Sequence, residues 1–315
     1  MDFDDILKMV VDRNASDLFI TEGMPPCLKV NGRVTPVSKT RLTDKQSREL
    51  VFSLMTPERR DEFENTKECN FAFQTKEGAR FRISAFVQRD AVGMVLRRIE
   101  TRIPTFDELG LPPILSKLAL AKRGIVFFVG ATGTGKSTSL AAMTGYRNHN
   151  TTGHIISIED PIEFLHDHHG CIVTQREVGV DTESYEVALR NTLRQAPDVI
   201  LIGEIRTREA MEHAITFAET GHLVLTTLHA NNANQALDRI IHFFPEESHG
   251  QVLLDLSLNL KGIIAQQLIR RPDGNGRRAI VEVLLNTPLA SDLIKKGEVS
   301  KLKDLMKRSN EQGMI

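Results

Sequence analysis

The chain has 315 residues, of which 41% are hydrophobic and 26% are charged, and this composition is typical of a soluble globular protein with about two domains. Lysine and arginine number 40 against 41 aspartates and glutamates, and a net charge of -1 argues against a protein that grips duplex DNA with a basic surface. The three cysteines, Cys27, Cys69 and Cys171, are far apart, so a disulfide framework and a structural zinc site are both disfavoured.

The N-terminal segment, MDFDDILKMVVDRN, is acidic and amphipathic and lacks the basic-then-apolar order of a signal peptide. No apolar run approaches the ~20 residues that a helix needs to span a bilayer. We therefore expect a cytoplasmic protein that reaches a membrane only through partners.

Residues 1–100 are predicted to form an α+β domain, because runs of strands with short turns dominate this part of the chain. Helical apolar spacing predicts helices over residues 2–13 and 42–55. Alternation of apolar and polar residues predicts strands over 27–37, with a hairpin turn at Asn31-Gly32, over 71–88, with a turn at 76–78, and over 91–99.

Residues 101–120, which contain several prolines and a short helical pattern, are predicted to link this domain to a second one over residues 121–315. In the second domain, short continuous apolar runs alternate with helical stretches, which is typical of an α/β fold with a parallel sheet between helices. The part after Pro245 is expected to be mostly helical. The predicted strands are 125–129, 154–158, 199–203, 222–228 and 279–285.

The strongest motif is GATGTGKST, residues 130–138, which fits the phosphate-loop pattern G-x-x-x-x-G-K-[ST] between an apolar strand and a helix-forming run. Its glycines let the backbone turn tightly and bring N–H groups close to phosphate oxygens. Lys136 is expected to reach the β- and γ-phosphates, and the Ser137 hydroxyl is expected to bind Mg²⁺. The predicted nucleotide-binding residues are Gly130, Ala131, Thr132, Gly133, Thr134, Gly135, Lys136, Ser137 and Thr138.

Phosphate-loop proteins commonly have a second buried strand that ends in Asp-Glu, and one of these carboxylates is missing here. In DVILIGEIR, residues 198–206, Gly203 stands at the Asp position, and Glu204 follows it. SIEDPIEF, residues 157–164, follows the strand after the phosphate-loop helix and is expected at the same edge of the sheet. Its three carboxylates are Glu159, Asp160 and Glu163, and one of them is expected to hold the attacking water. The alternative is that the segment is a solvated acidic loop.

Histidines and arginines supply candidate contacts to the transferring phosphate. HLVLTTLHANN is predicted to be a strand that begins at His222 and reaches His229 at its carboxyl end, where an imidazole can sense the γ-phosphate. Arg80 and Arg82 share one face of a predicted strand, and Arg97 lies in the next strand; positive charge stabilises the transition state of phosphoryl transfer. For each residue the alternative is a structural histidine or an ordinary surface arginine.

In combination, these motifs resemble the secretion ATPases of type IV pili and type II secretion. GATGTGKST, EDPIEF, LRQAPDVILIGEIRT and ETGHLVLTTLHANNA follow the order of the family's Walker A loop, Asp box, Walker B segment and His box, and Gly-Glu in place of Asp-Glu is normal there. Residues 15–34 resemble the start of the family's PAS-like domain. The resemblance implies an α/β fold, with a RecA-like P-loop ATPase domain after a smaller α+β PAS-like domain.

Within this family, the chain resembles the retraction branch, PilT/PilU, because it shows neither the long N-terminal extension nor the four-cysteine zinc motif of assembly ATPases. The main retraction motor usually carries AIRNLIRE where this chain has LASDLIKK, residues 289–296, so the chain is more similar to the PilU type. The resemblance implies a homohexameric ring that hydrolyses ATP with Mg²⁺ to retract pili. It also implies a place at the inner membrane, a platform protein there as partner, and a paralogous retraction ATPase beside it.

The resemblance implies roles for the candidate residues. Lys136 and Ser137 bind nucleotide and Mg²⁺, and Glu204 is the Walker B glutamate and a metal ligand. Glu163 is the expected general base, with Glu159 as its rival. His222 and His229 belong to the His box, and Arg82 and Arg97 match basic positions that reach a neighbour's nucleotide.

Three alternatives remain beside the retraction motor. One is an assembly or secretion ATPase with the same fold, which the absent zinc cysteines argue against. Another is a nucleotide-binding coupling subunit with little hydrolysis of its own. The third is a nucleic-acid translocase, which the neutral charge, two tyrosines and lack of tryptophan argue against, so no nucleic acid is expected as a partner.

Overall fold

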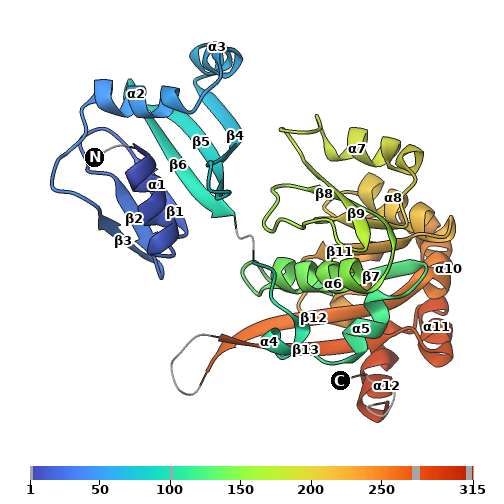
Figure 1. Cartoon of the computed structure of the whole chain (residues 1–315). Helices are drawn as coiled ribbons and strands as arrows, with labels where there is room; N and C mark the ends of the chain where they lie inside the picture. Colours follow the sequence, from blue (N-terminus) through green and yellow to red (C-terminus); the bar gives the residue numbers. More distant parts are fainter. Residues whose placement is uncertain (1–2, 100–101, 272–276, 310–313, 315) are drawn as a thin grey trace. The chain divides into compact units, whose positions relative to one another are not determined.

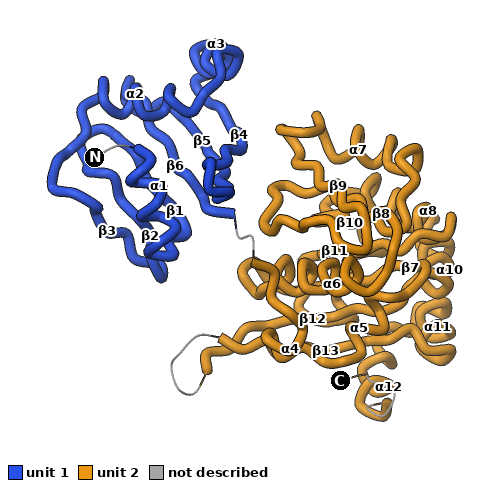
Figure 2. The backbone as a smooth tube through the Cα atoms, in the orientation of Figure 1, with its two compact units in different colours: residues 1–101 blue, residues 102–315 orange. Residues whose placement is uncertain are grey.

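The computed structural model describes residues 3–99, 102–271, 277–309 and 314. The chain divides into two compact units, unit 1 (Met1–Thr101) and unit 2 (Arg102–Ile315), which Figure 2 shows in separate colours. The segment 101–120, predicted as a linker, carries helices α4 (Phe106–Leu109) and α5 (Ile114–Ala119). Buried side chains of both helices belong to a core cluster of unit 2, so residues 102–120 are part of that unit.

Within its described residues, unit 1 forms one antiparallel sheet of six strands in the order β3-β2-β1-β6-β5-β4. The hairpin predicted at Asn31-Gly32 joins β2 to β3, and Asn31 and Gly32 have the positive φ angles, 50° and 80°, that such tight turns require. The strands are β1 (Asp17–Ile20), β2 (Cys27–Val30), β3 (Arg33–Pro36), β4 (Glu68–Gln74), β5 (Arg80–Gln88) and β6 (Ala91–Ile99).

The described residues of unit 1 also form three α-helices: α1 (Phe3–Asp12), α2 (Asp44–Ser53) and α3 (Pro57–Thr66). The apolar face of α1 is buried in the core of the unit together with side chains of the sheet. Thr43 and Gln46 form a capping box that starts α2, and the Thr56 hydroxyl accepts the N–H of Arg59 to start α3. Helix α3 and strand β1 were not predicted; α3 has no apolar face of helical period to reveal it.

Unit 2 has a seven-stranded sheet in its described part, in the order β13-β12-β7-β11-β10-β8-β9. All neighbouring strands are parallel except β13, which is an antiparallel edge strand. The predicted α/β class, with a smaller α+β unit before it, is confirmed. The strands are β7 (Gly124–Val129), β8 (Gly153–Glu159), β9 (Cys171–Glu177), β10 (Val199–Ile202), β11 (Leu223–Leu228), β12 (Leu260–Arg270) and β13 (Arg277–Leu285).

Two sequence predictions about the end of unit 2 were wrong. Residues 279–285 were predicted as a buried parallel strand, but β13 pairs antiparallel with β12 and is partly exposed. The part after Pro245 was predicted to be mostly helical, but it contains the whole β12–β13 hairpin. The first half of β12 is buried between β7 and β13, and an apolar run that is buried on both sides has no period that separates strand from helix.

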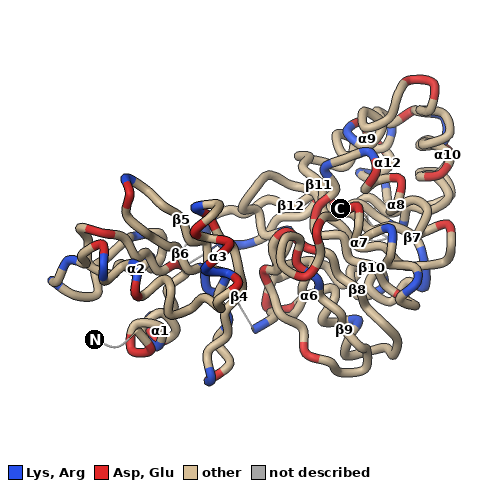
Figure 3. The backbone as a smooth tube through the Cα atoms, turned by 90° about the horizontal axis from the view of Figure 1, so that it is seen from above, with Lys and Arg blue, Asp and Glu red and all other residues tan. Residues whose placement is uncertain are grey.

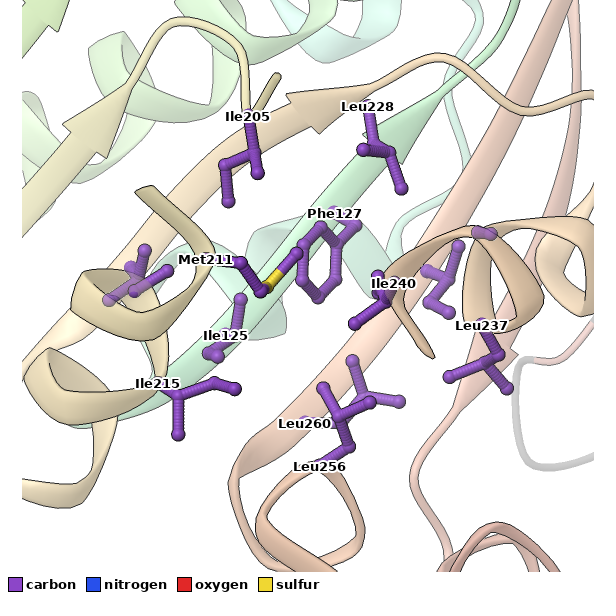
Figure 4. Close-up of a cluster of buried hydrophobic side chains, with 14 of the residues drawn as sticks. Ile125, Phe127, Ile205, Met211, Ile215, Leu228, Leu237, Ile240, Leu256 and Leu260 are labelled. Atoms are coloured by element: carbon purple, nitrogen blue, oxygen red, sulfur yellow. The ribbon is translucent and has the colours of Figure 1, made fainter. Parts of the chain in front are cut away.

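Helices cover both faces of this sheet (Figure 1). Alternate residues of β7 enter different clusters: Phe127 lies in one with side chains of α8, α9 and α10, and Phe128 lies in the other with side chains of α5 and α6. Figure 4 shows Phe127 beside Met211 of α8 and Ile240 of α9. The remaining α-helices of the unit are α6 (Lys136–Asn150), α7 (Tyr185–Thr192), α8 (Arg208–Glu219), α9 (Ala233–Ile241), α10 (His249–Asn259), α11 (Pro288–Lys295) and α12 (Leu302–Arg308).

The charge pattern of the sequence is also seen in the folded chain. Acidic and basic residues are interspersed along the backbone of each unit (Figure 3). Cys27, Cys69 and Cys171 are buried and free, so they form no disulfide. Among the helices that the structure describes, none is both long and apolar enough to cross a membrane.

Candidate functional site

A cavity of about 500 Å³ opens at the carboxyl edge of the sheet in unit 2. Its walls come from the loop after β7, the first turns of α6, and the segments that follow β8, β10 and β11, with Leu268 and Arg277 from the β12–β13 hairpin. Ligands of open α/β sheets bind at this edge, and the volume lies within the range of small-molecule sites. Six of the predicted loop residues line it: Thr132, Gly133, Gly135, Lys136, Ser137 and Thr138.

The loop between β7 and α6 has the backbone of an anion site. Gly133 and Gly135 have φ angles of 78° and 84°, which glycine adopts without strain. Helix α6 begins at Lys136 without a side-chain cap, whereas Ser184 caps α7 and Thr207 caps α8. The first N–H groups of α6 therefore remain available to a ligand, and the helix dipole favours a negative charge there.

The Lys136 ammonium is held inside the loop. The residue is 8% exposed, and its Nζ donates to the carbonyl oxygens of Gly130 (2.8 Å) and Ala131 (3.0 Å). Burial lowers the pKa of Lys136, and attraction to Glu204 and Glu163 opposes that shift. A buried cation whose partners are neutral carbonyls is well placed to exchange them for phosphate oxygens.

Glu204 is the second residue after the buried strand β10, and hydrogen bonds to β11 hold the backbone around it. The Thr227 hydroxyl donates to the carbonyl of Gly203 (2.7 Å), and the N–H of Ile205 donates to the carbonyl of Thr227 (3.0 Å). The Glu204 side chain is 13% exposed, and its two oxygens face the ring of His229 and the guanidinium of Arg206. The hydrogen bond from Arg206 to Glu204 raises the pKa of Arg206.

Packing explains why Gly203 stands where many phosphate-loop proteins have an aspartate. A Cβ atom at this position would lie 3.0 Å from the hydroxyl of Tyr185, 3.2 Å from the Cα of Glu159 and 3.3 Å from the carbonyl oxygen of Ile158. Two of these atoms belong to the backbone of β8, which pairs with β10 and cannot easily move. The site therefore has its carboxylate at Glu204 instead.

The two candidate base residues lie in different surroundings on the same cavity. Glu159 ends β8, and its Oε1 accepts hydrogen bonds from Ser157 Oγ (2.7 Å) and Gln175 Nε2 (3.1 Å). Burial raises the pKa of Glu159 to about 7, and these two hydrogen bonds oppose the shift. Glu163 lines the cavity as an exposed residue.

The structure separates the two candidate histidines. His229 lies at the cavity, where its Nδ1 is 3.3 Å from the carbonyl oxygen of Gly130 and its Nε2 faces Glu204. One imidazole thus contacts both the phosphate loop and Glu204. His222 lies at the amino end of β11, where its carbonyl accepts the N–H of Gly124 (3.0 Å) and its Nδ1 is 3.0 Å from the carbonyl oxygen of Phe217. This is the opposite edge of the sheet, so His222 lies outside the cavity.

Arg82 and Arg97 belong to unit 1, where they are directly opposite each other on β5 and β6. The Nε of Arg97 donates to Oδ1 of Asp17 (2.9 Å), whose side chain is 4% exposed. Asp17 in turn lies between Arg97 and Lys29 in the sheet. Two like charges in opposite positions repel, and the buried carboxylate of Asp17 offsets part of that repulsion.

The sequence did not predict a functional role for two cavity residues, Arg206 and Tyr185, or for Gln175, which contacts the cavity residue Glu159. Arg206 lies two residues after Glu204 and also approaches Asp160, at 3.5 Å. Gln175 comes from β9 and donates to Glu159, while the hydroxyl of Tyr185 is close to Gly203, and burial raises the pKa of this phenol. Arg206 could have been proposed from the sequence, because it lies in the Walker B segment two residues after Glu204. Gln175 and Tyr185 lie in no short motif.

The residues predicted to bind Mg²⁺ suit that ion chemically. Ser137 and Glu204 both line the cavity, and a hydroxyl and a carboxylate are the oxygen ligands that Mg²⁺ accepts beside phosphate oxygens and water. Across the described ranges, no group of three or more His, Cys, Asp or Glu residues could hold a metal ion alone. This agrees with an ion that is bound largely through the phosphates of its substrate.

Comparisons with known proteins agree with this geometry. The model of the family described as type II/IV secretion system protein matches residues 2–314. The chain is 69% identical over 314 residues to the type IV pilus ATPase PilU of Pseudomonas aeruginosa, which covers 100% of this chain and 82% of that protein. It is 40% identical over 314 residues to the type IV pilus retraction ATPase PilT of the same organism, covering 100% and 91%.

A solved structure gives the same result at the level of the fold. The crystal structure of the pilus retraction motor PilT with bound ADP matches with a TM-score of 0.92 at 37% identity, covering 100% of this chain and 94% of the other. The family model covers nearly the whole sequence, and identity to named relatives extends over the full chain. The chain therefore belongs to the type II/IV secretion system proteins and, within them, to the type IV pilus ATPases of the PilT/PilU family.

Proposed function

We propose that this chain hydrolyses ATP with Mg²⁺ and powers the retraction of type IV pili as a homohexameric ring. The observation that carries the proposal is the cavity, where the phosphate loop, the buried ammonium of Lys136 and the carboxylates of Glu159, Glu163 and Glu204 meet. The relatives named as a pilus ATPase and as a retraction ATPase support the choice of reaction and of machine.

In this proposal the loop and Lys136 bind the triphosphate. The N–H groups at the start of α6 and the Lys136 ammonium neutralise the β- and γ-phosphates, and Ser137 and Glu204 would hold Mg²⁺. Bound Mg²⁺ supplies further positive charge to the phosphates and to the leaving group. His229, which contacts both Gly130 and Glu204, would shift when the phosphate oxygens take over the contacts of the loop.

We propose Glu163 as the general base, with Glu159 as the competing candidate. Glu163 is open to water at the cavity wall, whereas one oxygen of Glu159 already accepts two hydrogen bonds. The raised pKa of Glu159, about 7, is nevertheless suitable for a base at neutral pH. Glu163→Gln should lower kcat about 100-fold, because a general base contributes at least that much. An equal loss in Glu159→Gln, with Glu163→Gln near wild type, would reverse the assignment.

We infer that Arg82 and Arg97 of one copy approach the nucleotide of a neighbouring copy in the ring. Positive charge near the γ-phosphate lowers the barrier of phosphoryl transfer, and Arg97 is held in place by the buried Asp17. The ring is expected to act at the inner-membrane base of the pilus. Its partners there would be the platform protein and a paralogous retraction ATPase, and it would bind no nucleic acid.

The test is steady-state phosphate release by the purified full chain, measured alone and with the paralogous retraction ATPase added. Glu204→Ala is the control, because it removes the carboxylate and leaves the phosphate loop intact. Release that disappears in the variant is the expected result. No release under either condition would contradict hydrolysis and favour a nucleotide-binding coupling subunit.

A further inference from the structure

Gln266 lies behind the phosphate loop, on a strand outside the four family motifs. Its neighbour Ala265 pairs with Val129, the last residue of β7, so Gln266 is level with Gly130, where the loop begins. The residue is 2% exposed and is not among those that line the cavity. Gln266 therefore lies outside the cavity wall, and we expect any effect of this residue on nucleotide binding to act through the loop.

The amide of Gln266 makes two hydrogen bonds to the loop–helix segment. Its Nε2 donates to the carbonyl oxygen of Thr134 (2.8 Å), and its Oε1 accepts from the hydroxyl of Ser139 on α6 (2.7 Å). The carbonyl of Thr134 can only accept, so it fixes which end of the amide faces the loop. With donor and acceptor both used, the buried amide is stable where it lies, and without it the Thr134 carbonyl would lose its partner.

Holding that carbonyl also sets the direction of the next N–H group. The peptide bond is planar and trans, so the C=O of Thr134 and the N–H of Gly135 point in opposite directions. Since the carbonyl points to Gln266 on β12, the N–H of Gly135 points away from β12. Gly135 lines the cavity, and the N–H groups of such a loop are what bind phosphate oxygens.

The loop packs closely against Gln266 at two of its glycines, Gly130 and Gly135. A Cβ atom on Gly130 would lie 2.5 Å from the carbonyl oxygen of Gln266, and one on Gly135 would lie 2.9 Å from its Nε2. Glycine is therefore needed at both positions for packing on β12 as well as for the approach of phosphate.

We propose that Gln266 is a positioning residue, which holds the carbonyl of Thr134 and thereby aims the N–H of Gly135 at the phosphates of the nucleotide. The proposal rests on the proposed nucleotide-binding function of the loop and adds to it a residue that no motif contains. It also connects the β12–β13 hairpin, which contributes Leu268 and Arg277 to the cavity wall, to the loop itself.

Three variants of the full chain separate the two hydrogen bonds. Gln266→Met keeps the length of the side chain and removes both bonds, whereas Gln266→Glu keeps the acceptor for Ser139 and loses the donor to Thr134. Ser139→Ala is the matched control, because it leaves the bond to Thr134 and removes the other. Each variant is measured for its Kd for fluorescent mant-ADP and for its unfolding midpoint without nucleotide.

Both Gln266 variants are expected to bind mant-ADP about tenfold more weakly, and Ser139→Ala to stay within about twofold of wild type even though its unfolding midpoint falls. The KM for ATP should rise about tenfold while kcat changes less than about threefold, because the contact to the phosphates exists in the ground state and the transition state alike. If Gln266→Met and Gln266→Glu weaken mant-ADP binding equally, the cause is the lost donor to Thr134 and not the negative charge of Glu.

Two results would overturn the inference: binding by Gln266→Met within twofold of wild type, or an equal loss in Ser139→Ala. The second result would mean that affinity follows the packing of this region as a whole. Failure of the wild-type chain to bind mant-ADP would instead contradict the proposed function. If Gln266→Met does not fold, Gln266→Glu and Ser139→Ala still decide the question.

Discussion

Helix α6 carries a buried cation near each of its ends, and the two have nearly the same immediate surroundings. Lys136 and Arg147 are both 8% exposed, and each donates to two backbone carbonyls. Burial lowers the pKa of both. Lys136 faces the cavity at the carboxyl edge of the sheet, whereas Arg147 binds the carbonyls of Ala119 and Ala121 at the connection between α5 and β7.

Burial and hydrogen bonding therefore do not distinguish the cation that we propose to bind phosphate from one that contacts only backbone carbonyls. The difference is the open space beside Lys136, into which a ligand with negative charge can bring new partners. The same holds for the histidines of β11, since His229 faces the cavity and His222 contacts backbone and a hydroxyl at the other edge. We therefore expect the role of each cation and each histidine to depend on whether it lies at the carboxyl edge of the sheet, and not on its residue type.

The largest expected effect separates the two cations. Lys136→Met should lower kcat/KM at least about 100-fold, because the charge proposed to bind the phosphates is gone, while stability falls less than in Arg147→Met because Ala131, one of its two carbonyl partners, is exposed to water. Arg147→Met should leave kcat within about twofold and cost about 3 kcal/mol of stability, because two buried carbonyls lose their donor. Phosphate release and calorimetry measure the two quantities. A loss of activity in Arg147→Met at a temperature where it is folded would break the comparison.

The histidines give a smaller difference in the same direction. His229→Ala should lower kcat about tenfold, since the ring connects the phosphate loop to Glu204, whereas His222→Ala should stay within about twofold. Both are single-site changes at opposite ends of β11, so each is the control for the other. Equal losses in steady-state phosphate release would show that the edge of the sheet does not decide the role of a histidine.

The smallest expected effect concerns stability and pH. The pKa of Glu159 is raised to about 7, so between pH 4.5 and 7 the folded chain holds a proton that the unfolded chain has lost. Stability from this group is therefore present at low pH and is lost as pH rises through 7. Glu159→Gln cannot titrate, so above pH 7 it should be more stable than wild type by on the order of 2 kcal/mol, with no difference near pH 4.5.

Calorimetry of both proteins at several pH values, without nucleotide or Mg²⁺, measures that difference. Ser157 and Gln175 can still donate to the amide oxygen of the variant, so their hydrogen bonds are retained. A stability difference between the two proteins that is constant over the whole pH range would show that folding does not raise the pKa of Glu159.

Local patterns in the sequence were enough to predict the strand–loop–helix arrangement around residues 130–138 and most of the strands. The motif GATGTGKST identifies residues 130–138 directly. The rule that ligands bind at the carboxyl edge of the sheet predicted that His229 and Glu159 lie near this loop. Strand β12 was missed because its buried half is apolar on both sides. Gln266 was missed because its partners, Ser139 and Thr134, are 127 and 132 residues away in the chain, and no local spacing reports such a contact.

Gly203 also limits how this site can evolve. A single substitution to aspartate would give the Asp-Glu pair of other phosphate-loop proteins, but its Cβ would meet Tyr185 and the backbone of β8 at 3.0–3.3 Å. Removing Tyr185 relieves one of these contacts and leaves the two to the backbone. Reaching the Asp-Glu arrangement would therefore require the backbone of β8 to shift by a few tenths of an ångström as well. The packing of β8 and Tyr185 thus favours retention of glycine at position 203 beside Glu204.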